Sequence, residues 1–363
     1  DRSPSRGLGD VYKRQGQEAM EAVEISRKKV AAIIAADPRE IIFTSGATES
    51  NNLALKGAAT FYGKKRKRII TAQTEHKCVI ETCKRLEASG YEVIFLPVKE
   101  TGILDFEALD ASVNEDTLIV SIMAAHNEIG VLQEITAIGE LCKKRGALFH
   151  TDAAQAIGKI PLDVQAMNID LMSISGHKIY GPKGIGALYI RRRPRVRINP
   201  LIDGGGQERG LRSGTLSTPL CVGLGEACEI ANQNLSHEPA RLLELRQRLY
   251  EGIIAAIPTT LLHGHIQQRL PGNLNISFPG IGCDQIMSAI PEIAFSSGSA
   301  CTSNSIDPSY VIKALGAPDD AAQGANRFGL GRFTTANEID YSIKRITSTI
   351  SSLSAKKEIT TSS

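Results

Sequence analysis

Several features that would assign a protein to a special class are missing from this sequence of 363 residues. Its seven cysteines contain no Cys-x-x-Cys pair, which favours reduced thiols in a cytoplasmic protein over disulfides or a structural zinc site. No apolar run approaches the roughly 20 residues of a membrane helix. No basic segment followed by an apolar one opens the chain, so we expect neither a membrane protein nor a signal peptide.

Strong net charge is also missing, since the whole chain carries only +3. Residues 1–15 differ in character from the rest, and residues 10–15 can be encoded by a transposase end used in sequencing libraries. We therefore expect residues 1–15 to be adapter-derived and the native N-terminus to be lost. This segment holds four Lys or Arg and two Asp, so the remainder carries +1. Such a chain gives no electrostatic argument for nucleic-acid binding, and we interpret the basic run 64–68 as a solvated loop.

The pattern that is present is an alternation of short apolar runs with helical stretches. The expected strands are 41–44, 69–72, 92–96, 117–121, 147–150 and 171–174. This pattern predicts an α/β fold with a mainly parallel central sheet flanked by helices. We expect one further strand over 186–190, antiparallel and at an edge of the sheet. The expected parts are a large domain over 16–236, a smaller α/β C-terminal domain over 237–352 and a flexible tail over 353–363.

Polar residues follow two of these apolar runs. Asp152 comes after the run 147–150, and Lys178 comes after the run 171–174. Ligands of parallel sheets bind beyond the carboxyl ends of the strands, so both side chains are candidates for one site. Pyridoxal phosphate needs a lysine amine for its Schiff base and a carboxylate that keeps its ring nitrogen protonated. The pair therefore predicts a pyridoxal-phosphate site.

Residues 44–50, with the sequence Thr-Ser-Gly-Ala-Thr-Glu-Ser, join an expected strand to an expected helix. Small residues let the backbone approach an anion, and N–H groups together with the hydroxyls of Ser45 and Thr48 are able to bind a phosphate. The alternative is an ordinary helix N-cap. The segment lacks the Gly-Lys-Ser/Thr ending of a nucleotide-binding P-loop.

Other polar residues also follow strands at the same expected edge. His76 is suited to stack on a planar ring and to move protons, although a helix cap or a surface position is the alternative. Asn127 is suited to bind a ring hydroxyl or a substrate carboxylate, and an ordinary turn is its alternative. We expect one pocket there because Thr48, Gln155 and Lys178 follow strands at the same edge.

Three further residues stand outside these strand ends. Cys301 lies in a small, polar segment with few large apolar neighbours, so we expect an exposed and reactive thiol rather than a core residue. Thr215 ends a glycine-rich loop and is suited to reach an anion. Arg327 is a candidate for a bidentate grip on a carboxylate, with a surface salt bridge as its alternative.

Taken together, these residues resemble the cysteine desulfurases of the NifS/IscS type. Those proteins are fold-type-I pyridoxal-phosphate enzymes of the class V aminotransferase family. The resemblance covers about residues 16–350, and its most specific motifs are 44–50, 74–77, 127–131, 175–184 and 297–303.

The resemblance implies a role for each matching residue. Lys178 forms the Schiff base, Cys301 attacks the substrate sulfur, and His76 stacks on the ring as a further catalytic residue. The implied cofactor-binding residues are Ala47, Thr48, His76, Asn127, Asp152, Gln155, Ser175, His177, Lys178 and Thr215, the last contributed by the other subunit of a homodimer. Asn127 and Arg327 are implied to bind the substrate carboxylate.

The reaction that the resemblance implies converts L-cysteine to L-alanine and leaves the sulfur as a persulfide on Cys301. The sulfur then passes to an acceptor protein, such as an iron–sulfur scaffold, for iron–sulfur cluster or other thio-cofactor synthesis. The alternatives are a selenocysteine lyase, another class V lyase or aminotransferase, and a non-catalytic fragment that lacks the N-terminal segment.

The chain departs from the family pattern at several positions. The family's N-terminal motifs, which help to cover the active site, are absent. His126 replaces a common Asn, and Asn326 and Gly329 replace an apolar residue and a Ser beside Arg327. A polar Asn326 inside a strand costs stability unless it is hydrogen-bonded.

Overall fold

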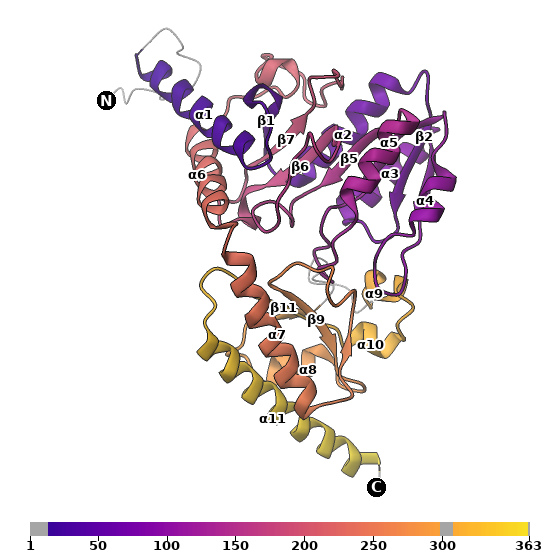
Figure 1. Cartoon of the computed structure of the whole chain (residues 1–363), viewed down its shortest axis with the longest axis vertical. Coiled ribbons are helices and arrows are strands. Elements are labelled where there is room, and N and C mark those ends of the chain that lie inside the picture. The colour runs from indigo at the N-terminus through magenta and orange to yellow at the C-terminus, as the bar shows by residue number, and fades with distance from the viewer. Residues whose placement is uncertain (1–13, 298–307, 362–363) are drawn as a thin grey trace. The chain divides into compact units, whose positions relative to one another are not determined.

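The computed structural model describes residues 14–297 and 308–361 and divides into two compact units (Figure 1). The first unit runs to Leu96 and adds Phe106–Ala125 and Gln133–Leu235, whereas the second consists of Pro97–Asp105, His126–Leu132 and the chain from Ser236 onward. The second unit therefore takes two short segments from within the sequence of the first. One of them carries the candidate residue Asn127.

The first unit is built on a seven-stranded sheet with the order β1-β7-β6-β5-β4-β2-β3. Its strands are β1 (Ile41–Thr44), β2 (Arg68–Ala72), β3 (Glu92–Leu96), β4 (Thr117–Ser121), β5 (Leu148–Asp152), β6 (Leu171–Ser175) and β7 (Gly186–Ile190). Every residue of β4 and of β6 is buried. Continuous burial is typical of parallel strands that are covered on both faces, which explains why their sequences are mainly apolar and why Ser173 of β6 is buried as well.

Strand β7 is antiparallel to both of its neighbours, β6 and β1. The antiparallel direction predicted for this strand is confirmed, but its predicted place at an edge is wrong, because β1 pairs with its outer side. Two reversals of direction leave β1 parallel to β6. The strands β1, β2, β4, β5 and β6 therefore point the same way, and their carboxyl ends share one edge of the sheet.

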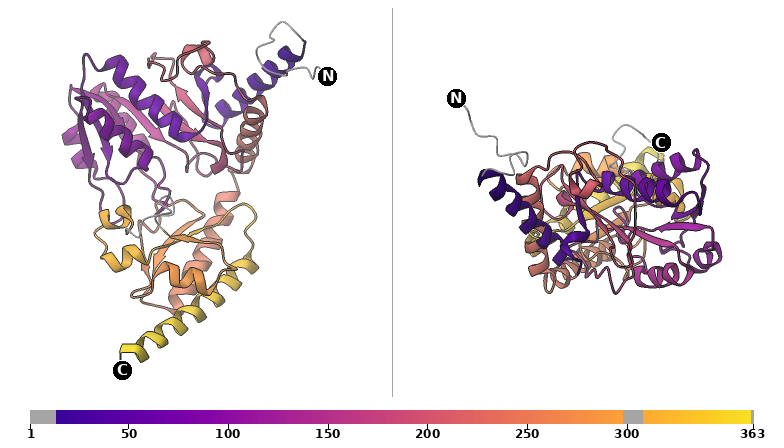
Figure 2. Two further views of the ribbon diagram at one scale, coloured as in Figure 1. Left: turned by 180° about the vertical axis from the view of Figure 1, so that it is seen from behind. Right: turned by 90° about the horizontal axis from the view of Figure 1, so that it is seen from above.

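Helices flank this sheet (Figures 1 and 2). They are α1 (Arg14–Ala32), α2 (Ala47–Tyr62), α3 (Lys77–Glu87), α4 (Phe106–Ser112), α5 (Ile135–Arg145) and α6 (Thr218–Asn234). Leu53 of α2 and Val79 of α3 are buried in one cluster with Ile69 and Ile119 of the sheet. Helix α5 ends at Gly146, whose φ of 69° turns the chain directly into β5.

The second unit contains an antiparallel sheet of four strands in the order β10-β11-β9-β8. Its elements are β8 (Leu261–Leu262), β9 (Asn273–Ser277), β10 (Ser296–Ser297), β11 (Asn326–Gly329), α7 (Glu238–Ala256), α8 (Cys283–Ala289), α9 (Tyr310–Ala314), α10 (Asp319–Gln323) and α11 (Ala336–Thr361). Leu249, Ile276, Phe328 and Ile346 bury their side chains in its core. Helix α11 extends into the segment 353–363, whose flexibility stays a prediction.

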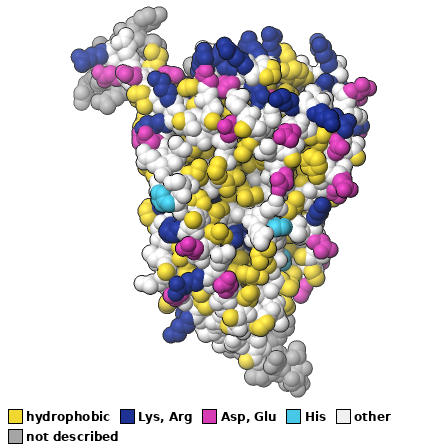
Figure 3. Space-filling view, in the orientation of Figure 1, with side chains coloured by type: hydrophobic (Ala, Val, Ile, Leu, Met, Phe, Trp, Pro, Cys, Tyr) yellow, Lys and Arg dark blue, Asp and Glu magenta, His cyan; other side chains and the backbone are white. Residues whose placement is uncertain are grey.

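The basic run 64–68 is only partly solvated. Lys64, Lys65 and Lys67 are exposed, and Lys67 lies 4.7 Å from the ring centre of Tyr91. Arg68 is half-buried and pairs with Glu92 on the neighbouring strand. Lys and Arg side chains gather at the upper end of the view in Figure 3. Among the described residues, no helix has the length and apolar character needed to cross a bilayer.

A buried ion pair anchors the loop 204–215, which carries Thr215. The Arg27 guanidinium donates to both carboxylate oxygens of Glu208, at 2.7 and 2.8 Å, and both side chains are almost fully buried. Glu208 also accepts from the backbone N–H of Phe43 at 2.6 Å. Arg27 donates to the carbonyl of Ile41, so helix α1, strand β1 and the loop are joined at one point.

Breaking this buried pair should destabilise the protein strongly. In Glu208→Gln the Arg27 charge loses its buried partner and keeps only the more exposed Glu24 carboxylate at 2.9 Å, which costs up to about 3–5 kcal/mol of unfolding free energy. The matched control is Asp340→Asn, which breaks the exposed Arg248–Asp340 pair and should cost less than about 1 kcal/mol. Urea denaturation of both variants measures the difference, and equal losses would contradict the anchoring role.

Candidate functional site

The carboxyl edge of the large sheet brings together most of the candidate residues of the first unit. Thr48 lies in the first turn of α2 after β1, and His76 immediately precedes α3 after β2. Asp152 is the last residue of β5, and Lys178 ends a short helical turn, Gly176–Lys178, after β6. The predicted convergence on one edge is confirmed for these four residues because their strands run in the same direction.

Asp152 is a carboxylate held below the surface. Only 5% of the residue is exposed, and its oxygens accept from the side-chain amide of Asn51 at 2.7 Å and from the backbone N–H of Ala154 at 2.9 Å. Burial raises the pKa of Asp152, whereas these two donors and the charges of His76 and Lys178 lower it. Within the described part of the chain no cation forms a salt bridge with Asp152, so its charge is solvated by N–H groups.

Asn51 was not found by sequence reasoning. It is fully buried on α2, one helical turn after Ala47, and its amide donates to Asp152 and also to the Cys78 sulfur at 3.2 Å. Its side-chain oxygen has no hydrogen-bond partner among the described residues. The sequence signal that could have identified Asn51 was a polar residue in a helical stretch where the nearby Leu53 and Ala54 are apolar.

His76 is the N-cap of α3, and its ring orientation is fixed by Cys78. The ring Nδ1 accepts from the backbone N–H of Cys78 at 3.2 Å and lies 3.0 Å from the Cys78 sulfur. Burial, with a smaller effect of Asp152, raises the pKa of the Cys78 thiol to about 12, so the thiol stays protonated. His76 therefore forms the helix N-cap that was the alternative to a functional role, and it remains a candidate for that role.

Gln155 has a partner that sequence reasoning also missed. The Lys159 ammonium donates to Gln155 Oε1 at 2.9 Å, which leaves the NH₂ group of the amide available for an acceptor. Burial, and then the charge of Lys178, lower the pKa of Lys159 to about 8. The spacing of four residues between Gln155 and Lys159 was the signal that could have found the pair.

The residues expected at a phosphate surround the start of α2 and the turn after β6. The N-cap Gly46 makes no side-chain capping bond and has a φ of 151°, which favours glycine. No side chain of the cap occupies the N–H groups of Ala47 and Thr48. A Cβ on Gly186 would lie 2.6 Å from the Gly46 Cα, so Gly186 is required by the close approach of this turn, whereas Gly46 is favoured by its φ alone.

Ser175 and His177, which are also expected to bind the phosphate, already contact each other. The Ser175 hydroxyl lies 3.1 Å from Nδ1 of His177, on either side of Gly176. Burial, followed by the charges of Lys178 and Lys183, lowers the pKa of His177. Thr215 is exposed at the end of the loop that Glu208 anchors.

The two candidates for substrate carboxylate binding lie in the second unit. Arg327 of β11 donates to the carbonyl oxygen of Asn127 at 3.0 Å and to the Ser296 hydroxyl at 3.1 Å. The surface salt bridge that was the alternative for Arg327 does not occur among the described residues. Burial raises the pKa of Glu128, although the positive charge of Arg327 acts to lower it.

The departures near these residues are accommodated locally. His126 is buried, and its Nδ1 accepts from the backbone N–H groups of Glu128 and Ile129. Asn326 donates to the carbonyl of Gly324 at 2.6 Å, so its burial in a strand is partly compensated. Cys301 lies outside the described residues.

The family model described as "Aminotransferase class-V" matches residues 7–341, a match that begins inside the segment expected to be adapter-derived. The cysteine desulfurase of Homo sapiens is 54% identical over 330 residues, which are 91% of this chain and 72% of the human protein.

Solved structures are also similar to this chain. A structure titled "NIFS-LIKE PROTEIN" superposes with a TM-score of 0.88 at 39% identity and covers 95% of this chain and 91% of that chain. A structure titled "SspA in complex with cysteine" has a TM-score of 0.77 at 36% identity and covers 89% of this chain and 90% of that chain.

Proposed function

The chain belongs to the class-V aminotransferase family and within it to the cysteine desulfurases, and on this basis we propose that it removes sulfur from L-cysteine to give L-alanine. The observation that carries the proposal is the buried Asp152 carboxylate at the strand edge that also presents Lys178. The similar structure of SspA is a complex with cysteine, which supports the same substrate.

The family depends in general on pyridoxal phosphate, and the residues present fit that group. Asp152 supplies a buried anion whose missing cation a protonated pyridine nitrogen would provide. Gly46 leaves an uncapped helix start at the same edge, suited to a phosphate. Ala47, Thr48, Ser175 and His177 would hold the phosphate.

Four further side chains would orient the cofactor ring. Asp152 would pair with the ring nitrogen, and His76 would cover the ring face. Gln155 would donate its NH₂ group to the ring hydroxyl, since Lys159 occupies its carbonyl. Lys178 would bind the aldehyde carbon through Nζ.

When bound, the cofactor supplies an electron sink for cleavage of the substrate Cα–H bond. Lys178 Nζ accepts the Cα proton and returns a proton to the product. Asn127 and Arg327 bind the substrate carboxylate. The Cys301 thiol takes the substrate sulfur: the substrate C–S bond breaks, an S–S bond forms, and L-cysteine plus the thiol become L-alanine plus a persulfide.

The partners of the reaction belong to the same proposal. The persulfide sulfur passes to an acceptor protein, such as a scaffold on which iron–sulfur clusters are assembled. The active form is a homodimer, in which the exposed Thr215 contributes to the phosphate site of the partner. Six cysteines of the described chain are free, which supports a reducing compartment such as the cytoplasm.

Two variants separate cofactor binding from sulfur transfer. Cys301→Ala should keep the visible absorbance of the bound cofactor yet release no sulfide from cysteine, because only the sulfur-accepting thiol is lost. Lys178→Ala should lose both the absorbance of the bound aldehyde and turnover. Absorbance spectra and a sulfide assay on the purified full chain measure these outcomes. Full activity in either variant would reject the assigned role.

Asn51→Leu tests how Asp152 is held ionised. Removing the amide donor should raise the pKa of Asp152 further, because one hydrogen bond to the charged form is lost. Asp152 would then become neutral at a higher pH, so cofactor affinity should begin to fall earlier as the pH is lowered. Titrations of cofactor absorbance at a series of pH values measure the shift.

The matched control for Asn51→Leu is Asn52→Leu. Asn52 lies on the same helix but donates to the carbonyl of Thr48. Its replacement should leave the pH dependence of cofactor binding unchanged. Coincident profiles for wild type and Asn51→Leu would show that the amide does not support the charge on Asp152.

A further inference from the structure

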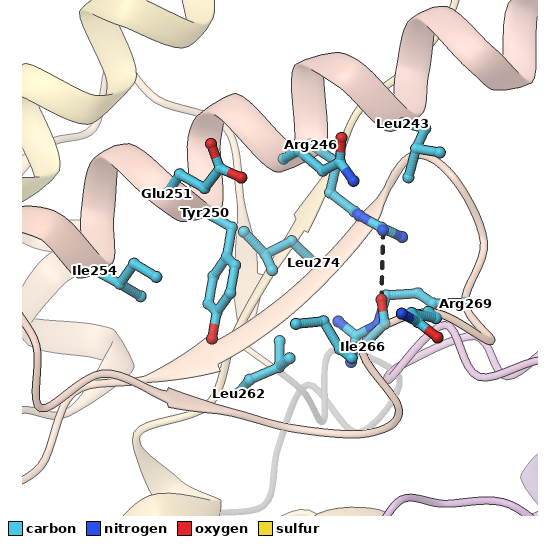
Figure 4. A pocket seen from close by; sticks show the side chains of 11 residues that line it. Leu243, Arg246, Tyr250, Glu251, Ile254, Leu262, Ile266, Arg269 and Leu274 are labelled. Atoms are coloured by element: carbon cyan, nitrogen blue, oxygen red, sulfur yellow. Dashed lines mark hydrogen bonds between the residues drawn. The ribbon is translucent and has the colours of Figure 1, made fainter.

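The second unit contains a pocket of about 430 Å³ between helix α7, the hairpin of β8 and β9, and the loop that precedes β9. Figure 4 shows Arg246 and Tyr250 projecting from α7, and Arg269 and Ile266 coming from the loop. The volume is within the range of about 300–1,000 Å³ that is typical of small-molecule sites.

One wall of the pocket is apolar. It consists of side chains from three different elements: Tyr250 and Ile254 of α7, Leu262 of β8 and Leu274 of β9. Ile266, which is 53% exposed, lies on the loop side of the lining. Such a wall suits a hydrocarbon or aromatic body, because burying apolar surface there is favourable.

The polar part of the pocket lining consists mainly of two buried arginines. Arg246 is 6% exposed and Arg269 is 4% exposed, and both line the pocket. Their hydrogen bonds go to backbone carbonyls, from Arg246 to Leu270 and Ile266, and from Arg269 to His263 and His265. Within the described chain neither guanidinium forms a salt bridge, and the exposed Glu251 of the lining pairs with neither.

One N–H donor group of these two arginines has no acceptor in the described chain. The Nη1 group of Arg269 is buried and has no hydrogen-bond partner among the described residues. Burial, and then the charge of Arg246, lower the pKa of Arg269, which reflects a buried positive charge without a compensating anion. A buried unpaired donor on a charged group costs free energy that a ligand is able to recover.

Arg248 of the same helix differs from Arg246 in having an ion pair, whereas Arg241, like Arg246, donates to backbone carbonyls. Arg248, two residues after Arg246, is exposed and makes two hydrogen bonds of 2.7 Å to the Asp340 carboxylate. The buried arginine thus lacks the ion pair that the exposed one has, which is the reverse of what stability alone favours.

We propose that this pocket binds a small organic oxyanion, a carboxylate or a phosphate carried on an apolar body. The guanidinium groups of Arg246 and Arg269 bind the anionic head, since planar guanidinium matches both anions. The apolar wall of Tyr250, Ile254, Leu262 and Leu274 accepts the body. The site is separate from the residues of the proposed sulfur transfer and does not rest on that function.

Isothermal titration calorimetry on the cofactor-loaded full chain tests the site with three probes. Phenylacetate and phenyl phosphate carry the two anionic heads, and 2-phenylacetamide is the neutral control. At least one anion should bind about tenfold or more tightly than the amide, because charge-assisted hydrogen bonds are lost in the amide. The anion that binds more tightly identifies the head group. Absence of binding by both anions, or equal binding of the amide, overturns the proposal.

Three variants locate the binding. Arg269→Met should weaken anion binding by about tenfold or more. Ile266→Trp keeps both arginines and the backbone contacts but fills the pocket, and it should weaken binding to a similar extent. Arg248→Met is the control on the same helix and should bind like wild type. Unchanged binding in Ile266→Trp would mean that the anion binds elsewhere, and the proposal would fail.

Discussion

The candidate site depends on one buried negative charge. Asp152 sits at the end of a strand with 5% of its surface exposed, so its charge must be stabilised by groups supplied by the fold. Asn51 and the N–H of Ala154 do this directly, and His76 and Lys178 contribute through their charges. Because these groups come from α2, α3 and the turns after β5 and β6, the charge is supported only when the whole sheet edge is formed.

The arrangement of the large sheet could be predicted from the sequence where strands are buried on both faces. The centre of β4, for example, is an uninterrupted apolar run, and the intervening helical stretches imply parallel crossovers. The interior place of β7 could not be predicted, because nothing in residues 186–190 records that β1 pairs with its outer side. Likewise, the contacts that draw His126–Leu132 into the second unit are distant in sequence.

The site itself divides in the same way. Asp152, Lys178 and His76 could be found because each follows a strand, and strand ends meet at one edge. Asn51, Cys78 and Lys159 contact Asp152, His76 and Gln155, respectively, rather than a ligand, and such a supporting partner is defined by distance in the folded chain. The spacing of four residues between Gln155 and Lys159 and the polar Asn51 within a largely apolar helix were visible in the sequence, but many residues without such partners share these patterns.

Each unit contains a buried charge that has no ion-pair partner among the described residues, and this indicates the charge of the ligand that would bind there. In the first unit Arg27 is neutralised by Glu208, and Arg191 lies 3.3 Å from Asp170, so these charges are satisfied by the protein itself. Asp152 in that unit, and Arg269 in the second, have no ion-pair partner in the described chain although both are buried. A buried charge that the fold holds without an ion pair keeps an opposite charge favourable at that point. The same physical argument that supports a cationic ring beside Asp152 therefore supports an anion beside Arg269.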